Sequence, residues 1–168
     1  MFRSIVAAVL LAAPAAAAQA TLLDSAREAY AAAWNISPLS VQSVAFVDRP
    51  AELIGDVVER KGAAFRQGEN ILIYAEPSGY AYIETLDGFE FGLDLDVEVL
   101  DSGGESLFRQ EGFQTVRLAS RRAVRELFLT MELELDGFDS GEYQIRIRAN
   151  DIASDETAEF TLPFAIED

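Results

Sequence analysis

The chain contains no cysteine and no histidine, and its only lysine is Lys61. Without cysteine no disulfide can form, so packing alone must stabilise the fold. These absences exclude Ser-His-Asp and Cys-His nucleophile systems, the usual zinc, copper and non-haem iron sites, and an imidazole pH switch. Carboxylates, hydroxyls and arginines remain for chemistry, without a nucleophile or phosphate-binding motif. The sequence therefore predicts no catalytic residue and no cofactor.

Positive charge is also scarce in this chain. Thirteen lysines and arginines stand against 29 aspartates and glutamates, so the formal net charge is −16. Such a charge repels nucleic acid and anionic lipid headgroups, and it favours solubility and cationic partners. Because half of the 168 residues are hydrophobic, a chain of this length can bury a core without metal or disulfide support.

The first twenty residues have the pattern of an export signal. Arg3 supplies a positive start, residues 5–18 form an apolar run, and Ala18-Gln19-Ala20 is a small-x-small cleavage site. The run has about 14 residues, too few for a helix to cross a bilayer of ~30 Å, so a membrane anchor is the weaker interpretation. We expect cleavage near Ala20 and Thr21, no membrane span afterwards, and a periplasmic or secreted protein.

The remaining chain predicts a short helix followed by strands. Apolar residues recur at helical spacing over residues 21–34, and Asn35 and Pro38 end that pattern, so we expect a helical segment over residues 21–38. Beyond it the apolar period changes to two, which is typical of strands with one buried face. Strands are expected over residues 41–47, 70–76, 80–85, 89–99, 106–109, 127–135, 142–150 and 157–166.

Seven or eight short strands with turns between them favour an all-β fold over residues 39–168. The uneven spacing of the strands favours an antiparallel β-sandwich of two sheets, and a β-barrel is the alternative. The only tryptophan, Trp34, lies in the helical segment, outside the predicted sandwich.

One short segment carries a resemblance to a known fold. Gly141 is followed two residues later by Tyr143, after a turn and at the start of an alternating strand. This spacing resembles the tyrosine corner of immunoglobulin-like and fibronectin-type sandwiches, whose tyrosine hydroxyl bonds backbone a few residues upstream. Residues 89–166 are similar in layout to exported bacterial immunoglobulin-like domains. The resemblance implies a fold and no activity, because such sandwiches serve many functions.

Acidic side chains repeat along one face of the strand at residues 89–99. Asp94, Asp96 and Glu98 would repel one another unless cations lie opposite, and Arg146 and Arg148 are the expected cross-strand partners. Such a ladder would contribute a few tenths of a kcal/mol per exposed pair. A calcium site that uses Asp94 and Asp96 is the functional alternative, since calcium prefers oxygen ligands.

Two further acids, Asp136 and Asp139, lie in a predicted turn. Sandwich loops are a usual place for calcium, so these two residues are also candidate metal ligands. The alternative is that they only form the turn, beside Gly137.

Four arginines, Arg117, Arg121, Arg122 and Arg125, gather within nine residues of a predicted loop. An arginine cluster can bind phosphate or carboxylate groups of a partner. The alternative is that these arginines neutralise acidic neighbours within the chain.

Aromatic side chains also gather between residues 74 and 91, with glutamates between them. We expect most of these rings in the core, and a carbohydrate-stacking surface is the alternative. The rings concerned are Tyr74, Tyr80, Tyr82, Phe89 and Phe91.

Together these patterns predict a non-catalytic, exported binding or assembly module that contacts a protein or a cell-envelope component. A calcium- or glycan-binding module is the first alternative, and a hydrolase built on a pair of carboxylates is the second. The helix at residues 22–34 could also dock a partner if its apolar face is not covered.

Overall fold

The computed structural model describes residues 14–134 and 136–168, apart from the side chains of residues 14–20. The chain divides into two units, an N-terminal one that ends at Ile36 and a second one over residues 37–168. Each is described by itself.

The N-terminal unit contains the helix α1, Pro14–Ile36. The helix predicted over residues 21–34 is therefore confirmed, but it begins earlier and continues through the predicted cleavage position. Proline suits a first helical turn because the missing N–H is not needed there. Most of the predicted export signal, residues 1–13, lies outside the described residues. Within the part that is described, no helix is both long and apolar enough to cross a membrane.

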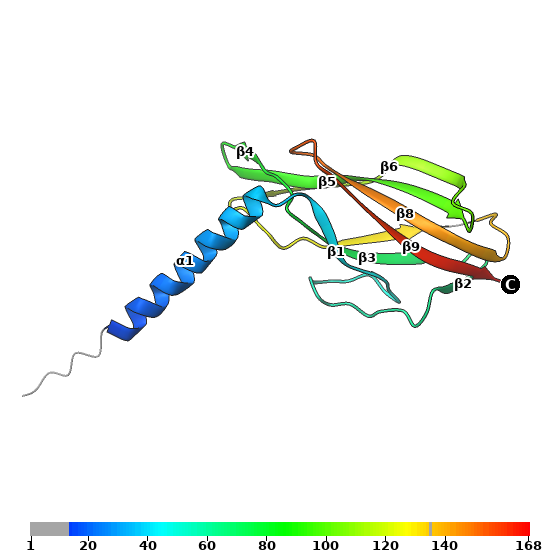
Figure 1. Ribbon diagram of the computed structural model, residues 1–168, viewed down its shortest axis with the longest axis horizontal. Coiled ribbons are helices and arrows are strands. Elements are labelled where there is room, and N and C mark those ends of the chain that lie inside the picture. Colours follow the sequence, from blue (N-terminus) through cyan, green and yellow to red (C-terminus); the bar gives the residue numbers. More distant parts are fainter. Residues whose placement is uncertain (1–13, 135) are drawn as a thin grey trace, which may run out of the picture. The chain divides into compact units, whose positions relative to one another are not determined.

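The described residues of the second unit form nine strands in two sheets (Figure 1). The smaller sheet has three antiparallel strands in the order β1-β3-β7. These are β1, Ser40–Phe46; β3, Ile71–Ser78; and β7, Leu129–Leu133.

The larger sheet is organised around β5 (Gly88–Asp101), which pairs with three other strands. On one side β5 pairs with β8 and with the short strand β4, and β6 also pairs with β5. The sheet continues from β8 to β9 and then to β2, and among the strands of the described residues the β2–β9 pairing alone is parallel. The bounds are β2, Ala64–Arg66; β4, Ile83–Thr85; β6, Ser106–Ser120; β8, Gly141–Asp151; and β9, Thr157–Glu167.

Aliphatic side chains from both sheets form the hydrophobic core. Ile73 and Met131 contribute from the smaller sheet, and Leu93, Leu95 and Ile147 from the larger one, all of them without solvent exposure. Burying each such side chain stabilises the fold by about 1.5–3 kcal/mol. The alternation predicted for residues 89–99 is confirmed, because the apolar row of β5 is buried while its acidic row faces outward.

The strand β6 corrects the sequence prediction, which ended it at Arg109. It continues to Ser120, and most of its residues are exposed. Most residues on both faces of β6 are exposed. Its sequence therefore lacks the regular alternation of apolar and polar residues along the whole strand, which is the pattern that predicts a strand. A bulge adds to this, since the register with β5 shifts between Gln110 and Gln114.

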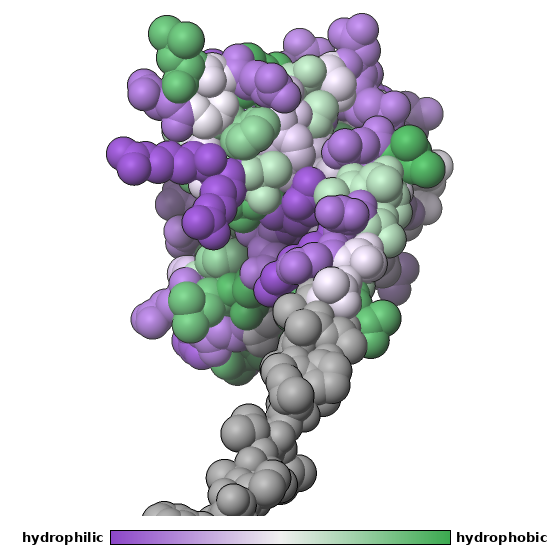
Figure 2. Space-filling model, turned by 90° about the vertical axis from the view of Figure 1, so that its left-hand side faces the viewer, coloured by the Kyte–Doolittle hydropathy of each residue, from purple (hydrophilic) through white to green (hydrophobic). Residues whose placement is uncertain are grey.

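Figure 2 shows one end of the molecule coloured by hydropathy. Where residues are coloured in this view, hydrophilic residues lie between smaller groups of hydrophobic ones.

The close approach of β5 to β6 requires glycine at position 92. Gly92 has a φ of +155°, and a Cβ added there would lie 1.9 Å from the carbonyl oxygen of Val116. We expect Gly92→Ala to lower the free energy of unfolding by about 3 kcal/mol, because backbone must shift to relieve the clash. Urea denaturation measures this change.

Gly104→Ala is the matched control for this prediction. Gly104 also has a positive φ, +87°, but an added Cβ would meet nothing within 4 Å. Its substitution should cost only about 1 kcal/mol, for backbone strain alone. Equal costs for the two variants would show that the close approach at Gly92 is wrong.

Candidate functional site

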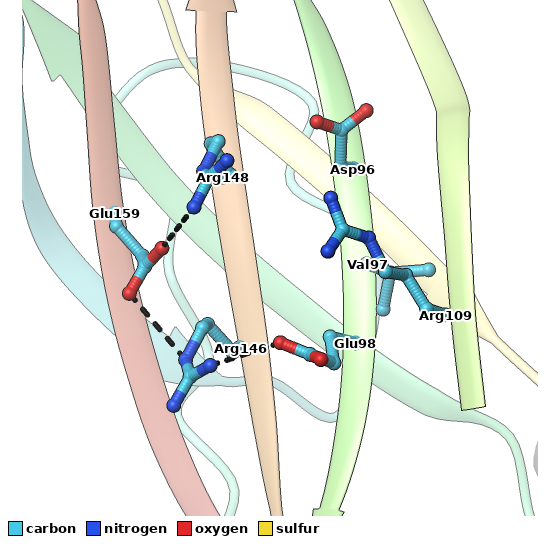
Figure 3. Close-up of a pocket in the computed structure, with 7 residues that line it drawn as sticks. All are labelled: Asp96, Val97, Glu98, Arg109, Arg146, Arg148 and Glu159. Atoms are coloured by element: carbon cyan, nitrogen blue, oxygen red, sulfur yellow. Dashed lines mark hydrogen bonds and ion pairs between the residues drawn. The ribbon is translucent and has the colours of Figure 1, made fainter. Parts of the chain in front are cut away.

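The outer face of the larger sheet carries a network of charged side chains. The register places Arg148 opposite Asp96 and Arg146 opposite Glu98, which confirms the predicted pairing of these two strands. Arg146 donates to Glu98 across 2.9 Å, so this step of the ladder forms as expected (Figure 3).

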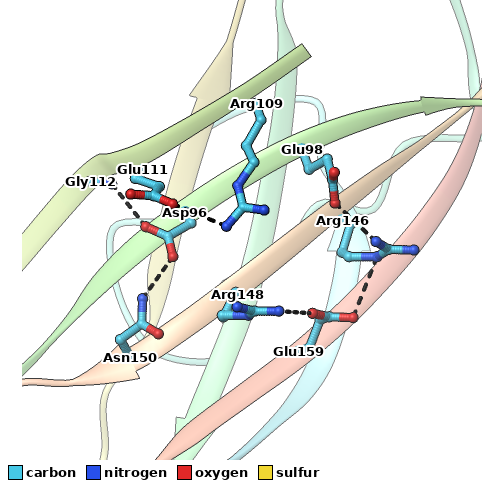
Figure 4. A network of polar contacts seen from close by, with 9 residues as sticks. All are labelled: Asp96, Glu98, Arg109, Glu111, Gly112, Arg146, Arg148, Asn150 and Glu159. Atoms are coloured by element: carbon cyan, nitrogen blue, oxygen red, sulfur yellow. Dashed lines mark hydrogen bonds and ion pairs between the residues drawn. The ribbon is translucent and has the colours of Figure 1, made fainter. Parts of the chain in front are cut away.

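The next step of the ladder differs from the prediction. Arg148 forms its ion pair with Glu159 of β9 at 3.3 Å, and Arg146 reaches the same carboxylate at 3.4 Å. Asp96 instead accepts hydrogen bonds from the Gly112 amide at 2.9 Å and from the Asn150 side chain at 3.0 Å (Figure 4). The carboxylate of Asp96 therefore closes the bulge of β6 rather than pairing with arginine.

The charged side chains that line the shallow hollow in this face all have hydrogen-bond or ion-pair partners. They are Asp96, Glu98, Arg109, Arg146, Arg148 and Glu159. Each has a partner, including Arg109, which pairs with Glu111 at 3.1 Å. Each charged group of the hollow is thus satisfied by a neighbour in the lining or next to it.

Glu98 is the residue of this network whose pKa is shifted. A hydrogen bond with Ser106 and the positive charges of Arg146 and Arg109 hold its pKa below the ordinary value of 4.5, against the opposing effect of burial. Its side chain is 19% exposed, so solvent screens these interactions only in part.

The candidate calcium ligands do not converge. Asp94 accepts a hydrogen bond from the Thr115 hydroxyl at 2.7 Å, and Asp96 is bound as described above. Asp136 and Asp139 are exposed in the β7–β8 connection. Among the described residues, no group of three or more acids could hold a metal ion. A calcium site in this chain stays a prediction.

Tyr143 makes the bond that a tyrosine corner makes. Its hydroxyl donates to the carbonyl of Asp139, four residues upstream, across 2.8 Å. The ring lies between Phe138 and Phe164, with centroids 5.6 Å away in both cases. Gly141 lies beside the ring, where an added Cβ would be in ordinary contact with it. The bond and the ring contacts together fix the turn that leads into β8.

The aromatic cluster is mostly core. Tyr80 and Phe91 are buried and stacked, with ring centroids 5.5 Å apart, and Tyr82 contacts both Phe89 and Phe91 edge-on. Tyr74 is not part of it, because it stacks on Phe128 in a separate pair. Tyr82 and Phe89 are half-buried, so the expectation that most of these rings lie in the core is confirmed, and a carbohydrate-stacking surface stays a prediction.

Two tyrosines of this cluster anchor the chain after β6. The hydroxyls of Tyr80 and Tyr82 both donate to the carbonyl of Val124. Val124 lies in the segment that carries Arg121, Arg122 and Arg125, so the core holds this segment in place.

The sequence predicted that the four arginines lie in one loop, but the structure distributes them over a strand, a bend and an irregular segment. Arg117 lies in β6, Arg121 and Arg122 in the bend that follows, and Arg125 in the irregular chain before β7. Within the described residues, Arg117, Arg121 and Arg122 form no ion pair, although acids outnumber cations in the chain. The expectation that these three arginines neutralise neighbouring acids is not met by direct contacts.

The strand that carries Arg117 is paired on one side only. In the described part of the chain, β6 pairs with β5 and with no other strand, so its second edge is open (Figure 1). Leu107, Phe108 and Leu118 along it are 51%, 42% and 40% exposed. Sequence reasoning missed this edge, and the β-branched pair Thr115 and Val116 was the available signal for a strand.

Comparisons with known proteins give no relative for this chain. No family model and no curated protein matches it. Among solved structures, it is similar to the Pseudomonas fluorescens alkylpurine DNA glycosylase AlkC bound to DNA that contains an abasic site analog, with 9% identity and a TM-score of 0.44. The alignment covers 79% of this chain and 31% of the glycosylase, so this chain spans about a third of that protein.

A second similarity is to the CARDB domain of the PF1109 protein from Pyrococcus furiosus. The crystal structure, in complex with di-metal ions, has 12% identity and a TM-score of 0.31, and the alignment covers 77% of this chain and 86% of that one. The solution structure of the same domain has 11% identity and a TM-score of 0.32, over 77% and 92% of the two chains. At these scores the similarities carry no functional argument.

The lowered pKa of Glu98 makes a prediction about acid stability. A carboxyl whose folded-state pKa is lowered stabilises the fold above its unfolded-state pKa and loses that contribution as the pH falls through the folded-state value. We expect Glu98→Gln to lower the free energy of unfolding by about 0.5–1 kcal/mol at neutral pH. The difference from the unsubstituted protein should shrink at pH values below 4.5. Urea denaturation over a pH series measures it.

Glu105→Gln is the control for Glu98→Gln, since Glu105 is exposed at the β5–β6 turn and its side chain makes no ion pair in the described part of the chain. It should have little effect at any pH. A cost for Glu98→Gln that does not change with pH would contradict the electrostatic explanation.

The hydroxyl of Tyr143 should contribute measurably to stability. Tyr143→Phe removes the bond to Asp139 but keeps the ring, so we expect a loss of about 1 kcal/mol in thermal or urea unfolding. Tyr143→Leu, which also removes the ring contacts, should cost about 2–3 kcal/mol. A Tyr143→Phe protein as stable as the unsubstituted one would show that the tyrosine bond is not needed.

Proposed function

We propose that this chain is an exported, non-catalytic binding or assembly module with an immunoglobulin-like sandwich, which contacts a protein of the cell envelope through the open edge of β6. The observation that carries the proposal is the pairing of β6, which is 15 residues long and, in the part of the chain that the structure describes, pairs with a neighbouring strand on one side only.

Two features support the immunoglobulin-like assignment. The strands form two sheets over one core, and Tyr143 bonds to the Asp139 carbonyl at the entrance of β8. In immunoglobulin-like sandwiches the corner tyrosine occupies this position relative to its strand.

An open strand edge is a natural docking surface. Its unpaired N–H and C=O groups can bond to a strand from another chain, and natural proteins usually protect such edges by making them short, charged or covered. The β6 edge is long and exposes Leu107, Phe108 and Leu118, so apolar contacts can add to backbone hydrogen bonds. The bulge near Gly112 and the nearby arginines restrict which strands can pair with this edge, but they do not cover it.

The charged groups of the sheet favour binding over catalysis. The carboxylates that line the outer hollow are committed to arginine, amide or backbone partners. A hydrolase needs one carboxyl group to remain protonated and near its partner acid, and among the acids of this hollow the resolved pKa change, at Glu98, is a lowering.

Site-specific photo-crosslinking tests the proposal in cells of the source organism. A photoreactive phenylalanine derivative at Leu107 or Leu118 should give a discrete adduct with one envelope protein, because both positions lie on the β6 edge. The same group at Leu53, which is 70% exposed but distant in sequence from β6, is the control. Equal adducts from Leu53, or none from β6, would contradict the proposal.

A further inference from the structure

We infer that the part of β6 from Gln114 to Ser120 binds an extended peptide in which acidic residues alternate with apolar ones. This inference rests on the proposed function and identifies the chemistry of the partner segment. It follows from the different character of the two faces of β6 and from the arginines at its end.

The middle of the inner face of this part of β6 is apolar and only partly covered, between the polar residues Gln114 and Ser120. Val116 lies opposite Leu93 of β5, and Leu118 lies opposite Phe91, and both of these β5 residues are buried. Leu118 itself is 40% exposed, so part of its apolar side chain is open to solvent. A strand added at the open edge would place its own inner residues beside Val116 and Leu118, where apolar side chains bury the most surface.

The outer face of the same segment carries one cation, Arg117. Arg117 lies opposite Gly92, which has no side chain to contact it. The acids at the diagonal positions of β5, Glu90 and Asp94, form no ion pair with Arg117, and Asp94 is bound to the hydroxyl of Thr115. An acidic residue on an added strand, beside Arg117, would therefore gain a direct partner.

Two more cations lie in the bend just beyond the end of β6. Arg121 and Arg122 follow Ser120 directly, and neither forms an ion pair within the described residues. The net charge of −16 opposes the approach of an acidic peptide. At physiological salt, however, charges are screened beyond about 8 Å, so contacts with these arginines outweigh the more distant acids.

The bulge defines where the docking edge begins. The Gly112 amide is bound to Asp96, and the register with β5 resumes at Gln114. Glu111, within the bulge, would repel an acidic strand. The remaining edge, residues 114–120, matches the usual length of a strand of about five or six residues.

Three capped eight-residue peptides test the inference by fluorescence anisotropy with the purified protein. Valine alternates with glutamate in the first, with threonine in the second and with lysine in the third. We expect the glutamate peptide to bind about tenfold more tightly than the threonine peptide, because its carboxylates form ion pairs with Arg117, Arg121 and Arg122. The lysine peptide should bind most weakly, and added salt should reduce the difference.

Two sets of variants and one modified peptide locate the site. Replacing Arg117, Arg121 and Arg122 together by glutamine should bring the glutamate peptide to the affinity of the threonine peptide. The same replacement of Arg27, Arg49 and Arg66 changes the net charge equally and should leave the preference intact. A glutamate peptide methylated at alternate backbone nitrogens cannot pair along the edge on that side, and it should lose binding.

The outcomes separate this inference from the proposed function. Equal affinities for glutamate and threonine peptides would overturn the acidic preference and leave edge pairing standing. Failure of every peptide, while crosslinking from Leu118 still captures a protein, would overturn the inference alone, and failure of both would overturn both. Arginine-dependent binding to phosphatidylglycerol vesicles, without peptide binding, would overturn the peptide in favour of a lipid headgroup.

Discussion

The alternation of buried and outward side chains along β5 is the constraint on which the rest of this structure depends. Its inner row, which includes Leu93, Leu95 and Val97, is buried, while the strand pairs with β8 on one side and with β6 on the other. A shift of one residue would move this entire row to the solvent face, so the register of both neighbours follows from it. The larger sheet is therefore assembled around one strand.

The same alternation creates an electrostatic problem on the outer face. Asp94, Asp96 and Glu98 project together and would repel one another without partners. Each finds a different kind of partner: the Thr115 hydroxyl, an amide pair, and an arginine. These contacts link β5 to β6 and β8, so neutralising the acids also holds the strands in register.

The arginines at the end of β6 contrast with this compensated network. Arg146 and Arg148 are used within the sheet, whereas Arg117, Arg121 and Arg122 form no ion pair in the described residues. The chain has many more acids than cations, so these arginines form no ion pair because no acid of the described residues lies close enough to them, and not because acids are few. Position on an open edge, together with partly exposed Val116 and Leu118, makes this region the best candidate for a docking surface.

Sequence patterns predicted the elements that have one buried face. The helix, β5, β8 and β9 follow from periodicity, and the Tyr143 bond follows from a local spacing, because these features depend on residues that are close in the chain. The length of β6 was missed because neither of its faces is well buried, and the parallel strand β2 was missed because three residues hold no usable period.

By itself the sequence determined the all-β character of residues 39–168, the presence of a helix over residues 21–34 and the exclusion of histidine and cysteine chemistry, since composition and short-range periodicity carry that information. The tertiary structure alone decided that Arg148 pairs with Glu159 instead of Asp96, that Tyr74 lies apart from the other aromatic rings, and that one edge of β6 stays open. Each of these depends on which strands become neighbours. That choice is made by burial of the whole core, and no local segment of the chain encodes it.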